Sequence, residues 1–443
     1  MQIDPWGSSQ FQDYARLRDE FGIAAFGADE YGVFSSPHRL FRRGVVFGHR
    51  DFERVSDAVR GHDPWSVMTG FMPSGDLHMG HKMVLEQVIA HQAEGADAHL
   101  ALADFEAMAA RGFTQEKAQR VALDQYVHNA LALGLKSERA EFYFQTKRHR
   151  VNTLAHRFGQ KVTWGTMQKL YGFEDGISVA HLLAPLVQAA DILHSQQDEA
   201  GARPILVPVG VDQDPHIRLT RDIAGDWRWF GLTWLKGERG PQLTLSVRRS
   251  EDKKTALDLA ERALRDNGYG ELRRNDAYGT MDIKGGTPKD ERRIDLVLAR
   301  AEQAAGNAEA LLRPSATFHR FMTGLQGGKM SSSKPESSIY LTEDAKTAEK
   351  KLKSSVTGGR ATAEEQRRLG ANPYVCPVYE MYLYHLARDD AHLQEVHDTC
   401  KSGARLCGGC KGEAWGLLAE FLKSHQEKRD QVAHQVQAIV SAN

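Results

Sequence analysis

Two histidines near the start of the chain have the spacing of a phosphate-binding turn. His78 and His81 follow the glycine-containing stretch at residues 73–77, and a helix is predicted to begin beside them. Residues three apart lie on the same side of a helix turn, so both rings could donate N–H groups to phosphate oxygens. The free backbone N–H groups of a helix start also attract anions. Because so short a pattern also matches by chance, two surface histidines beside an ordinary turn are the alternative interpretation.

A loop of lysines and serines lies about 250 residues further along, at residues 328–334. Lys329 and Lys334 supply mobile positive charges, and the three serines between them, Ser331, Ser332 and Ser333, supply hydroxyl and backbone donors. Alone, such a loop would be a flexible linker. Together with the histidine turn, it predicts the second half of a clamp around a triphosphate.

The elements that must position these residues follow an alternating pattern. Strands are predicted at residues 66–69, 99–103, 141–145 and 204–209, with helices between them and one helix over 80–91. This alternation predicts an α/β fold: a Rossmann-like, doubly wound parallel sheet. From about residue 373, apolar residues at helical spacing predict a C-terminal α-helical domain.

The changes in pattern divide the chain into five segments. We predict an N-terminal extension at 1–62, the first part of the catalytic domain at 63–234 and a charged insertion at 235–313. The catalytic domain resumes at 314–358 with the lysine and serine loop, and the helical domain covers 359–443. A solvated surface excursion is favoured for the insertion over a dedicated binding module.

Composition sets broad limits on location and partners. The 443 residues are 41% hydrophobic and 26% charged, with a net charge of −1, which neither requires nor excludes a nucleic-acid partner. No apolar run approaches the ~20 residues of a membrane helix. The first residues have neither the basic flank nor the apolar stretch of a signal peptide, so we expect a cytoplasmic protein without membrane contact.

Four cysteines form a separate candidate site near the C-terminus. Cys376, Cys400, Cys407 and Cys410 are separated by 23, 6 and 2 residues. Four thiolates with one close pair suit tetrahedral zinc or a [4Fe–4S] cluster. Simple reduced thiols remain an alternative, whereas disulfides are not expected in a reducing compartment.

The two signatures resemble the HIGH and KMSKS motifs of class I aminoacyl-tRNA synthetases. The segment 208–222, Pro-Val-Gly-Val-Asp-Gln-Asp-Pro-His-Ile-Arg-Leu-Thr-Arg-Asp, is similar to the DQDPH and TRD element of the tryptophanyl family, and the resemblance is strongest to archaeal-type members. Further matching pieces span most of the chain but leave 235–313 uncovered. One departure is Ser332, which stands where the family has a second lysine, so Lys329, helped by Lys334, would carry that role.

The resemblance implies an activity and a set of site residues. Tryptophan would be activated with ATP and Mg²⁺ and then transferred to the 3′ end of tRNA(Trp), by a homodimer. The implied catalytic residues are His78, His81 and Lys329; those for ATP are Gly80, Met330, Ser331, Ser332, Ser333, Lys334 and Asp212; those for tryptophan are Phe71, Gln188, Asp191 and Gln213.

Within this set, Asp191 would accept the indole N–H, although a helix-surface carboxylate is its alternative interpretation. Some tryptophanyl-tRNA synthetases with nearly this cysteine spacing hold a [4Fe–4S] cluster near the anticodon-binding region. A cluster is therefore expected on the four cysteines, with zinc as the second choice.

Three rival functions stay open at this point. Tyrosyl-tRNA synthetases share the fold and both signatures, and they have a segment similar to residues 184–193. A synthetase-like RNA-binding protein without catalysis is disfavoured by the intact His78, His81 and Lys329. A small-molecule nucleotidylyltransferase can share the histidine turn, but the helical tail disfavours it.

Overall fold

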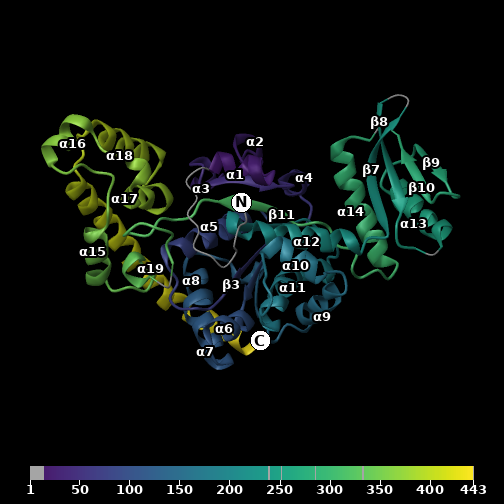
Figure 1. Ribbon diagram of the computed structural model, residues 1–443, viewed down its shortest axis with the longest axis horizontal. Coiled ribbons are helices and arrows are strands. Elements are labelled where there is room, and N and C mark those ends of the chain that lie inside the picture. Colours follow the sequence, from purple (N-terminus) through teal and green to yellow (C-terminus); the bar gives the residue numbers. More distant parts are fainter. Residues whose placement is uncertain (1–13, 238–239, 251, 285, 332–333, 443) are drawn as a thin grey trace.

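The computed structural model describes residues 14–237, 240–250, 252–284, 286–331 and 334–442 (Figure 1). A seven-stranded sheet forms its centre. The strands of this sheet are β1 (Ala24–Ala25), β2 (Val46–Arg50), β3 (Ser66–Phe71), β4 (Asp97–Leu102), β5 (Ala140–Phe144), β6 (Ile205–Gly210) and β11 (Ser315–His319). The predicted strands that became β3, β4, β5 and β6 are confirmed. None of the described helices is long and apolar enough to cross a membrane.

The strand order in this sheet is β1-β2-β11-β6-β3-β4-β5. From β11 to β5 all neighbours pair in parallel, whereas β2 pairs antiparallel with β11, and β1 with β2. The predicted α/β class with a doubly wound parallel sheet is confirmed. The antiparallel edge comes from residues before 62, so that part of the chain is built into the sheet.

Helices cover the sheet and extend the chain beyond it. Those of the central part are α1 (Tyr14–Phe21), α2 (Ala28–Tyr31), α3 (Arg39–Arg42), α4 (Phe52–Gly61), α5 (Met79–Ala93), α6 (Asp104–Arg111), α7 (Gln115–Val121), η1 (Ala122–Val127), α8 (His128–Ala132), η2 (Ser137–Arg139), α9 (His149–Gly159), α10 (Trp164–Tyr171), α11 (Val179–Leu193), η3 (His194–Gln197), η4 (Val211–Gln213) and α12 (Asp214–Asp226). Two separate groups of buried apolar side chains pack around the strands, one including Leu85 of α5 and the other Leu193 of α11.

The strand order changes direction between β3 and β6. The chain runs from β3 outward through β4 to β5, then returns to β6 and β11 on the other side. Hydrogen bonding between β3 and β6 covers only two residue pairs near their starts, Ser66 with Ile205 and Val67 with Leu206. The carboxyl ends of the two strands are not paired with each other. In open α/β sheets, ligands bind outside the carboxyl ends of strands at such a switch point.

A second sheet lies to one side of the first, at the right of Figure 1. Its order is β7-β8-β10-β9, all antiparallel, and its own apolar core includes Leu243, Leu257 and Leu298. It comprises β7 (Phe230–Gly237), β8 (Gly240–Val247), α13 (Lys253–Asp266), β9 (Leu272–Asn275), β10 (Thr280–Ile283) and α14 (Pro288–Ala304). The predicted insertion at 235–313 falls largely on this packed unit.

The C-terminal part is helical, as predicted, and lies at the left of Figure 1. Its elements are η5 (Pro335–Ser337), α15 (Ala345–Ser354), α16 (Ala363–Leu369), η6 (Pro373–Val375), α17 (Pro377–Met381), η7 (Tyr382–Leu386), α18 (Asp390–Ser402) and α19 (Cys407–Ala442). The long helix α19 returns to the central part and packs on α8. A buried hydrogen bond joins His425 of α19 to the Asn129 side chain at 2.7 Å.

Candidate active site at the switch point of the sheet

The two signature histidines stack on each other at the start of α5. Their ring centroids are 3.8 Å apart and the rings are inclined by 19°. The Gly80 N–H donates to His78 Nδ1 at 3.1 Å, and the His78 N–H donates to His81 Nδ1 at 3.3 Å. Because Nδ1 accepts in both rings, a neutral ring carries its hydrogen on Nε2. The backbone therefore sets two Nε2–H donors at a helix start.

Both histidines are held neutral. Burial lowers the pKa of His81 to about 4, helped by the charge of Lys329. Burial also lowers the pKa of His78 well below its usual value, with further contributions from His81 and Lys329. Neutral stacked rings do not repel each other, and they can still donate hydrogen bonds to phosphate oxygens.

Lys329 occupies the end of a tight hairpin. The Met330 N–H donates to the Met322 carbonyl at 2.8 Å, and Thr323 faces Lys329 in an antiparallel bridge. Gly327 and Gly328 make the turn with φ of +85° and +77°, a region in which side chains other than glycine are strained. The hairpin is thus held by backbone geometry as well as by hydrogen bonds.

The side chain of Lys329 points back to the turn after β6. Its ammonium nitrogen lies 2.9 Å from Asp212 Oδ2 and 4.1 Å from the centre of the Phe321 ring. Burial raises the pKa of Asp212, and the nearby Lys329 opposes that rise. Asp212 follows the carboxyl end of β6, as His78 follows that of β3, so the two predicted signatures and the 208–222 segment meet at the switch point.

The segment after the lysine hairpin is joined directly to the histidine turn. The Met79 N–H donates to the Ile339 carbonyl at 3.0 Å, and the Leu341 N–H donates to the Leu77 carbonyl at 2.9 Å. Met330 is buried, and its sulfur lies close to Gly80. Lys334 is exposed, and Ser331 is half-buried, its carbonyl accepting from the Ser338 hydroxyl at 3.0 Å. Ser332 and Ser333 lie outside the described residues.

Asp191 lies near the end of α11 and is buried, so it is not a helix-surface carboxylate. The Tyr143 hydroxyl donates to its Oδ1 at 3.0 Å, and the Gln145 amide donates to its Oδ2 at 2.6 Å. Burial raises the pKa of Asp191 to about 8, which the two donors only partly oppose. Tyr143, Gln145 and Asp191 therefore form one buried polar group, called the Asp191 set below.

Of the other residues predicted for tryptophan binding, Gln188 and Gln213 contact each other, and Phe71 lies beside His81. The Gln188 amide, one turn before Asp191 on α11, donates to Gln213 Oε1 at 3.3 Å. Gln213 is the neighbour of Asp212, so the contacts run from Lys329 through Asp212 and the two glutamines to α11. Phe71 is buried with its ring edge-on to His81, centroids 6.0 Å apart.

Sequence reasoning did not single out Tyr143, Gln145 or Glu106. Tyr143 and Gln145 are two residues apart at the carboxyl end of a predicted parallel strand, so their side chains lie on the same face of the sheet, and this spacing could have identified them. Glu106 follows β4 at the same edge of the sheet, and burial raises its pKa to about 7. The charge of Glu106 also raises the pKa of Asp191, so the two carboxyl groups lie near each other.

The four cysteines gather around one small enclosed cavity, with Gly358 and Gly359 in its lining. A methyl group at Gly359 would come within 2.6 Å of Cys407 Sγ, so the glycine makes room for the sulfur. Among the described residues, no three of the cysteine sulfurs all lie within 4.8 Å of one another. Tetrahedral zinc with Zn–S bonds of about 2.3 Å would hold its sulfurs roughly 3.8 Å apart. The arrangement is therefore wider than a single zinc ion requires.

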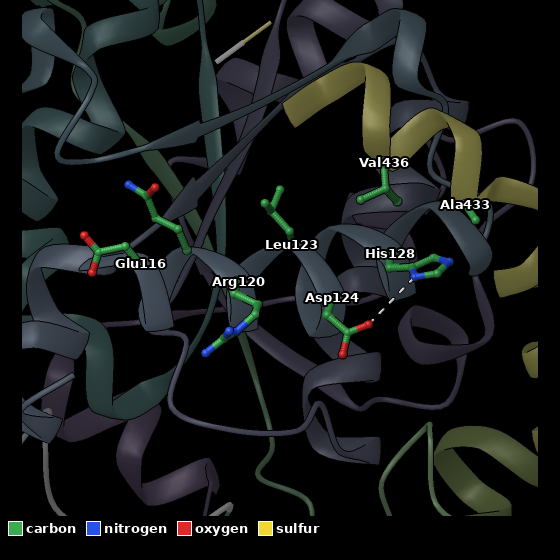
Figure 2. A pocket seen from close by; sticks show the side chains of 8 residues that line it. Glu116, Arg120, Leu123, Asp124, His128, Ala433 and Val436 are labelled. Carbon is green, nitrogen blue, oxygen red and sulfur yellow. Dashed lines mark ion pairs between the residues drawn. The ribbon is translucent and has the colours of Figure 1, made fainter. Parts of the chain in front are cut away.

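A larger hollow of about 500 Å³ lies elsewhere on the surface (Figure 2). It is formed by α7, η1 and α8 together with the end of α19, and Asp124 and His128, one turn apart on the same helical stretch, form an ion pair at 4.0 Å along one wall. No residue of either signature lines it. The chemistry-bearing residues thus assemble at the switch point and not in this hollow.

Comparison with known proteins agrees with the site geometry. The family model of class I tRNA synthetases (W and Y) matches residues 60–230 and 292–423. The tryptophan–tRNA ligase of Methanosarcina acetivorans is 42% identical over 440 residues, covering 97% of this chain and 96% of that protein. The chain belongs to the class I tryptophanyl-tRNA synthetases.

Other relatives of this synthetase support the same assignment. The tryptophan–tRNA ligase of Thermoplasma acidophilum is 41% identical, covering 97% of each chain. The crystal structure of the tryptophanyl-tRNA synthetase from Aeropyrum pernix has a TM-score of 0.73 and 37% identity, covering 99% of this chain and 98% of that one. These matches favour the tryptophanyl over the tyrosyl branch, and residues 231–291, left out by the family model, fall largely on the second sheet.

Proposed function

We infer that this synthetase activates L-tryptophan with ATP and transfers it to the 3′ end of tRNA(Trp). The observation that carries the inference is the meeting of His78, His81, Lys329 and Asp212 at the switch point of a sheet shared with tryptophanyl-tRNA synthetases. The α-carboxylate of tryptophan attacks the α-phosphorus of ATP. The bond to the β-phosphate oxygen breaks, and pyrophosphate leaves with the electron pair. The 3′-terminal ribose oxygen of the tRNA then displaces AMP from the adenylate.

The side chains at the switch point would promote the reaction by positioning ATP and by stabilising the charge on its phosphates. The two Nε2–H donors of His78 and His81 are set to bind phosphate oxygens without a change in protonation. Lys329 would leave Asp212 and pair with the β- and γ-phosphates of ATP. Negative charge develops on these phosphates as pyrophosphate departs. Mg²⁺ accompanying ATP would neutralise part of the same charge. Asp212, released by Lys329, would accept from the ribose.

We assign the amino-acid side of the site to α11 and the adjoining strand ends. The Asp191 set offers a fixed acceptor for the single N–H of the indole. Gln188 and Gln213 lie between that acceptor and the phosphate donors, a position suited to the carboxylate of tryptophan. Glu106, whose pKa is raised to about 7 by burial, would pair with the substrate ammonium.

Pyrophosphate exchange with purified protein tests this assignment. We expect exchange that depends on tryptophan, and charging of tRNA with labelled tryptophan. Exchange that depends on tyrosine would replace the assignment with the tyrosyl one. Failure of both exchange and charging would leave the synthetase-like RNA-binding protein.

We further propose that the four cysteines hold a [4Fe–4S] cluster in preference to zinc. Two observations support this: all four cysteines line one cavity, and no three of their described sulfurs lie as close together as the ligands of one zinc ion would. In a [4Fe–4S] cluster each thiolate binds a different iron atom, so the four sulfurs lie further apart than they would around one zinc ion. It would fix the contacts among α16, α17, α18 and the start of α19.

We also propose a homodimer that covers an apolar patch. Five large apolar side chains are exposed on α6, α10 and α11: Phe105, Met108, Trp164, Val179 and Leu183. Val179 is 70% exposed, and α6 contacts α11, which carries two of these residues. Exposed apolar groups of this kind mark association surfaces. Light scattering should report a dimer for the native chain and a monomer for Val179→Asp; a monomeric native chain would refute the proposal.

A further inference from the structure

Three metal-binding side chains converge beside the Asp191 set. His99 of β4 and Glu141 of β5 are register partners on adjacent strands, and His194 directly follows α11. One possible ligand atom from each lies within 4.8 Å of the other two. Among the described residues, no other set of three histidine, cysteine, aspartate or glutamate side chains meets this distance.

The hydrogen bonding of His194 leaves one nitrogen ready to bind an ion. Its Nδ1 lies 2.8 Å from the main-chain carbonyl oxygen of Asp191. A carbonyl only accepts, so Nδ1 carries the hydrogen and Nε2 carries the lone pair in the neutral ring. The ring is 0% exposed, and its Nε2 makes no hydrogen bond to any described residue. Donation from the second ring nitrogen to a carbonyl is the usual arrangement for a metal-binding histidine.

The lone pair on His194 Nε2 faces a carboxylate oxygen. His194 Nε2 lies 3.9 Å from Glu141 Oε2, and the same oxygen lies 3.0 Å from His99 Nδ1. A buried imidazole lone pair that faces a carboxylate oxygen is unfavourable unless a cation or a proton lies between the two atoms. Two metal–ligand bonds of about 2.1 Å can span up to about 4.2 Å, so one ion can contact both atoms as they stand.

The surroundings allow an ion to enter. The Glu141 side chain is 36% exposed, whereas both histidines are buried, so the set opens to solvent on the carboxylate side. Arg148 pairs with the other carboxylate oxygen, Oε1, and leaves Oε2 to the two histidines. An all-protein network, in which protons alone join the histidines to Glu141, is the competing arrangement.

We propose that His99, Glu141 and His194 bind a divalent transition-metal ion, with Zn²⁺ as the best match. Two imidazoles and one carboxylate, with a further position open to water, suit zinc. Mg²⁺ prefers a shell of oxygens and keeps its waters, so this site is separate from the Mg²⁺ that accompanies ATP. The ion would fix the His194 ring and, through its Nδ1–H, the end of α11 that carries Asp191. Only this last consequence rests on the proposed role of Asp191.

Cobalt titration of the full-length chain after chelator treatment tests the site. Co²⁺ bound to nitrogen and oxygen ligands absorbs in the visible range, whereas Co²⁺ bound to thiolates adds a charge-transfer band in the near ultraviolet. The titration is therefore performed on the native chain and on a Cys407→Ser, Cys410→Ser chain. In the cysteine variant we expect one Co²⁺ per chain without the thiolate band, displaced by Zn²⁺ and not by Mg²⁺, and in the native chain the same visible absorption.

Three variants separate this site from chance binding by histidine. Glu141→Gln, on the exposed side of the set, should weaken Co²⁺ binding by at least about tenfold. His194→Asn should do the same while its amide still donates to the Asp191 carbonyl. His156→Gln, on the exposed face of α9, should bind Co²⁺ like the native chain. Binding unchanged in Glu141→Gln, or no Co²⁺ outside the thiolates, would overturn the proposal in favour of the proton network.

Discussion

The ammonium nitrogen of Lys329 lies 2.9 Å from the carboxylate of Asp212, although the two residues are 117 positions apart in the chain. The contact joins the lysine hairpin to the turn after β6 at the place where the sheet reverses its order. In this state the lysine is already held beside the histidine turn. The loop must exchange one anionic partner, Asp212, for the phosphates of ATP.

Replacing Lys329 with alanine should slow tryptophanyl-adenylate formation by about 10²–10³-fold, because a positive charge aimed at the departing phosphates is lost. The dissociation constant for tryptophan should change little, since the Asp191 set is separate from the loop. Single-turnover kinetics and equilibrium binding measure the two quantities. Lys334→Ala, in the same loop but exposed, is the control and should slow the reaction less. A native single-turnover rate in Lys329→Ala would refute the role.

Two amide substitutions at His78 should separate helix capping from phosphate binding. Asparagine places its amide near the position of Nδ1 and can keep the contact with the Gly80 N–H. Glutamine reaches the position of Nε2 and can keep the donor to phosphate. We expect His78→Asn to retain stability but lose activity. His78→Gln should retain more activity and lose about 1 kcal/mol of stability with the cap.

Urea unfolding and single-turnover rates of these two His78 variants provide the comparison. If the asparagine variant were the more active one, the Nε2–H of His78 would not be the group that binds phosphate.

Asp191→Asn should raise the KM for tryptophan by about tenfold to a hundredfold and leave the KM for ATP nearly unchanged. The change removes one of the best acceptors from a buried polar group and leaves the Tyr143 and Gln145 donors poorly matched. Glu199→Gln, an exposed carboxylate a few residues further on, is the control. Equal KM values for tryptophan in both variants would remove Asp191 from the amino-acid site.

Stability should fall as the pH drops from about 6.5 towards 4. Burial lowers the pKa of His91, His216, His319 and His385 to about 3, so the unfolded chain binds protons in this range that the native chain does not. Stability therefore rises with pH and levels off above about 6.5, as far as these groups are concerned. Each such group contributes up to about 1.4 kcal/mol per pH unit.

Unfolding by urea at several pH values measures this slope. His91 is a suitable probe because it is fully buried among Phe34, Phe41 and Trp65. His91→Phe should reduce the slope by about one proton, while the exposed His156→Gln should leave it unchanged. A slope that His91→Phe does not reduce would contradict the buried neutral state of His91.

Anaerobically purified protein should contain about four iron and four acid-labile sulfide per chain. Cys410→Ser should lose both and loosen the helical domain, which limited proteolysis would detect. Cysteine-dependent zinc without sulfide would support the second choice, and the absence of iron, zinc and sulfide would end the metal hypothesis for the cysteines.

The sequence by itself determined the parallel strands β3, β4, β5 and β6, the helix that begins beside His78 and His81, and the helical C-terminal part. Each of these depends on local periodicity or on turn residues within a few positions. The sequence did not reveal β1 and β11, since a two-residue strand and a strand after a long insertion have little local pattern. It also gave no sign that residues 230–304 would form a sheet with its own core.

Only the tertiary structure decided which of the chemical groups meet. The contact of Lys329 with Asp212, the buried donors on Asp191 and the approach of His194 to Glu141 all join residues that are 46 or more positions apart. Such contacts depend on the order of strands in the sheet and on which strand ends remain unpaired. Residue types alone therefore predicted the kind of chemistry, while the order of β3 and β6 in the sheet fixed where it can take place.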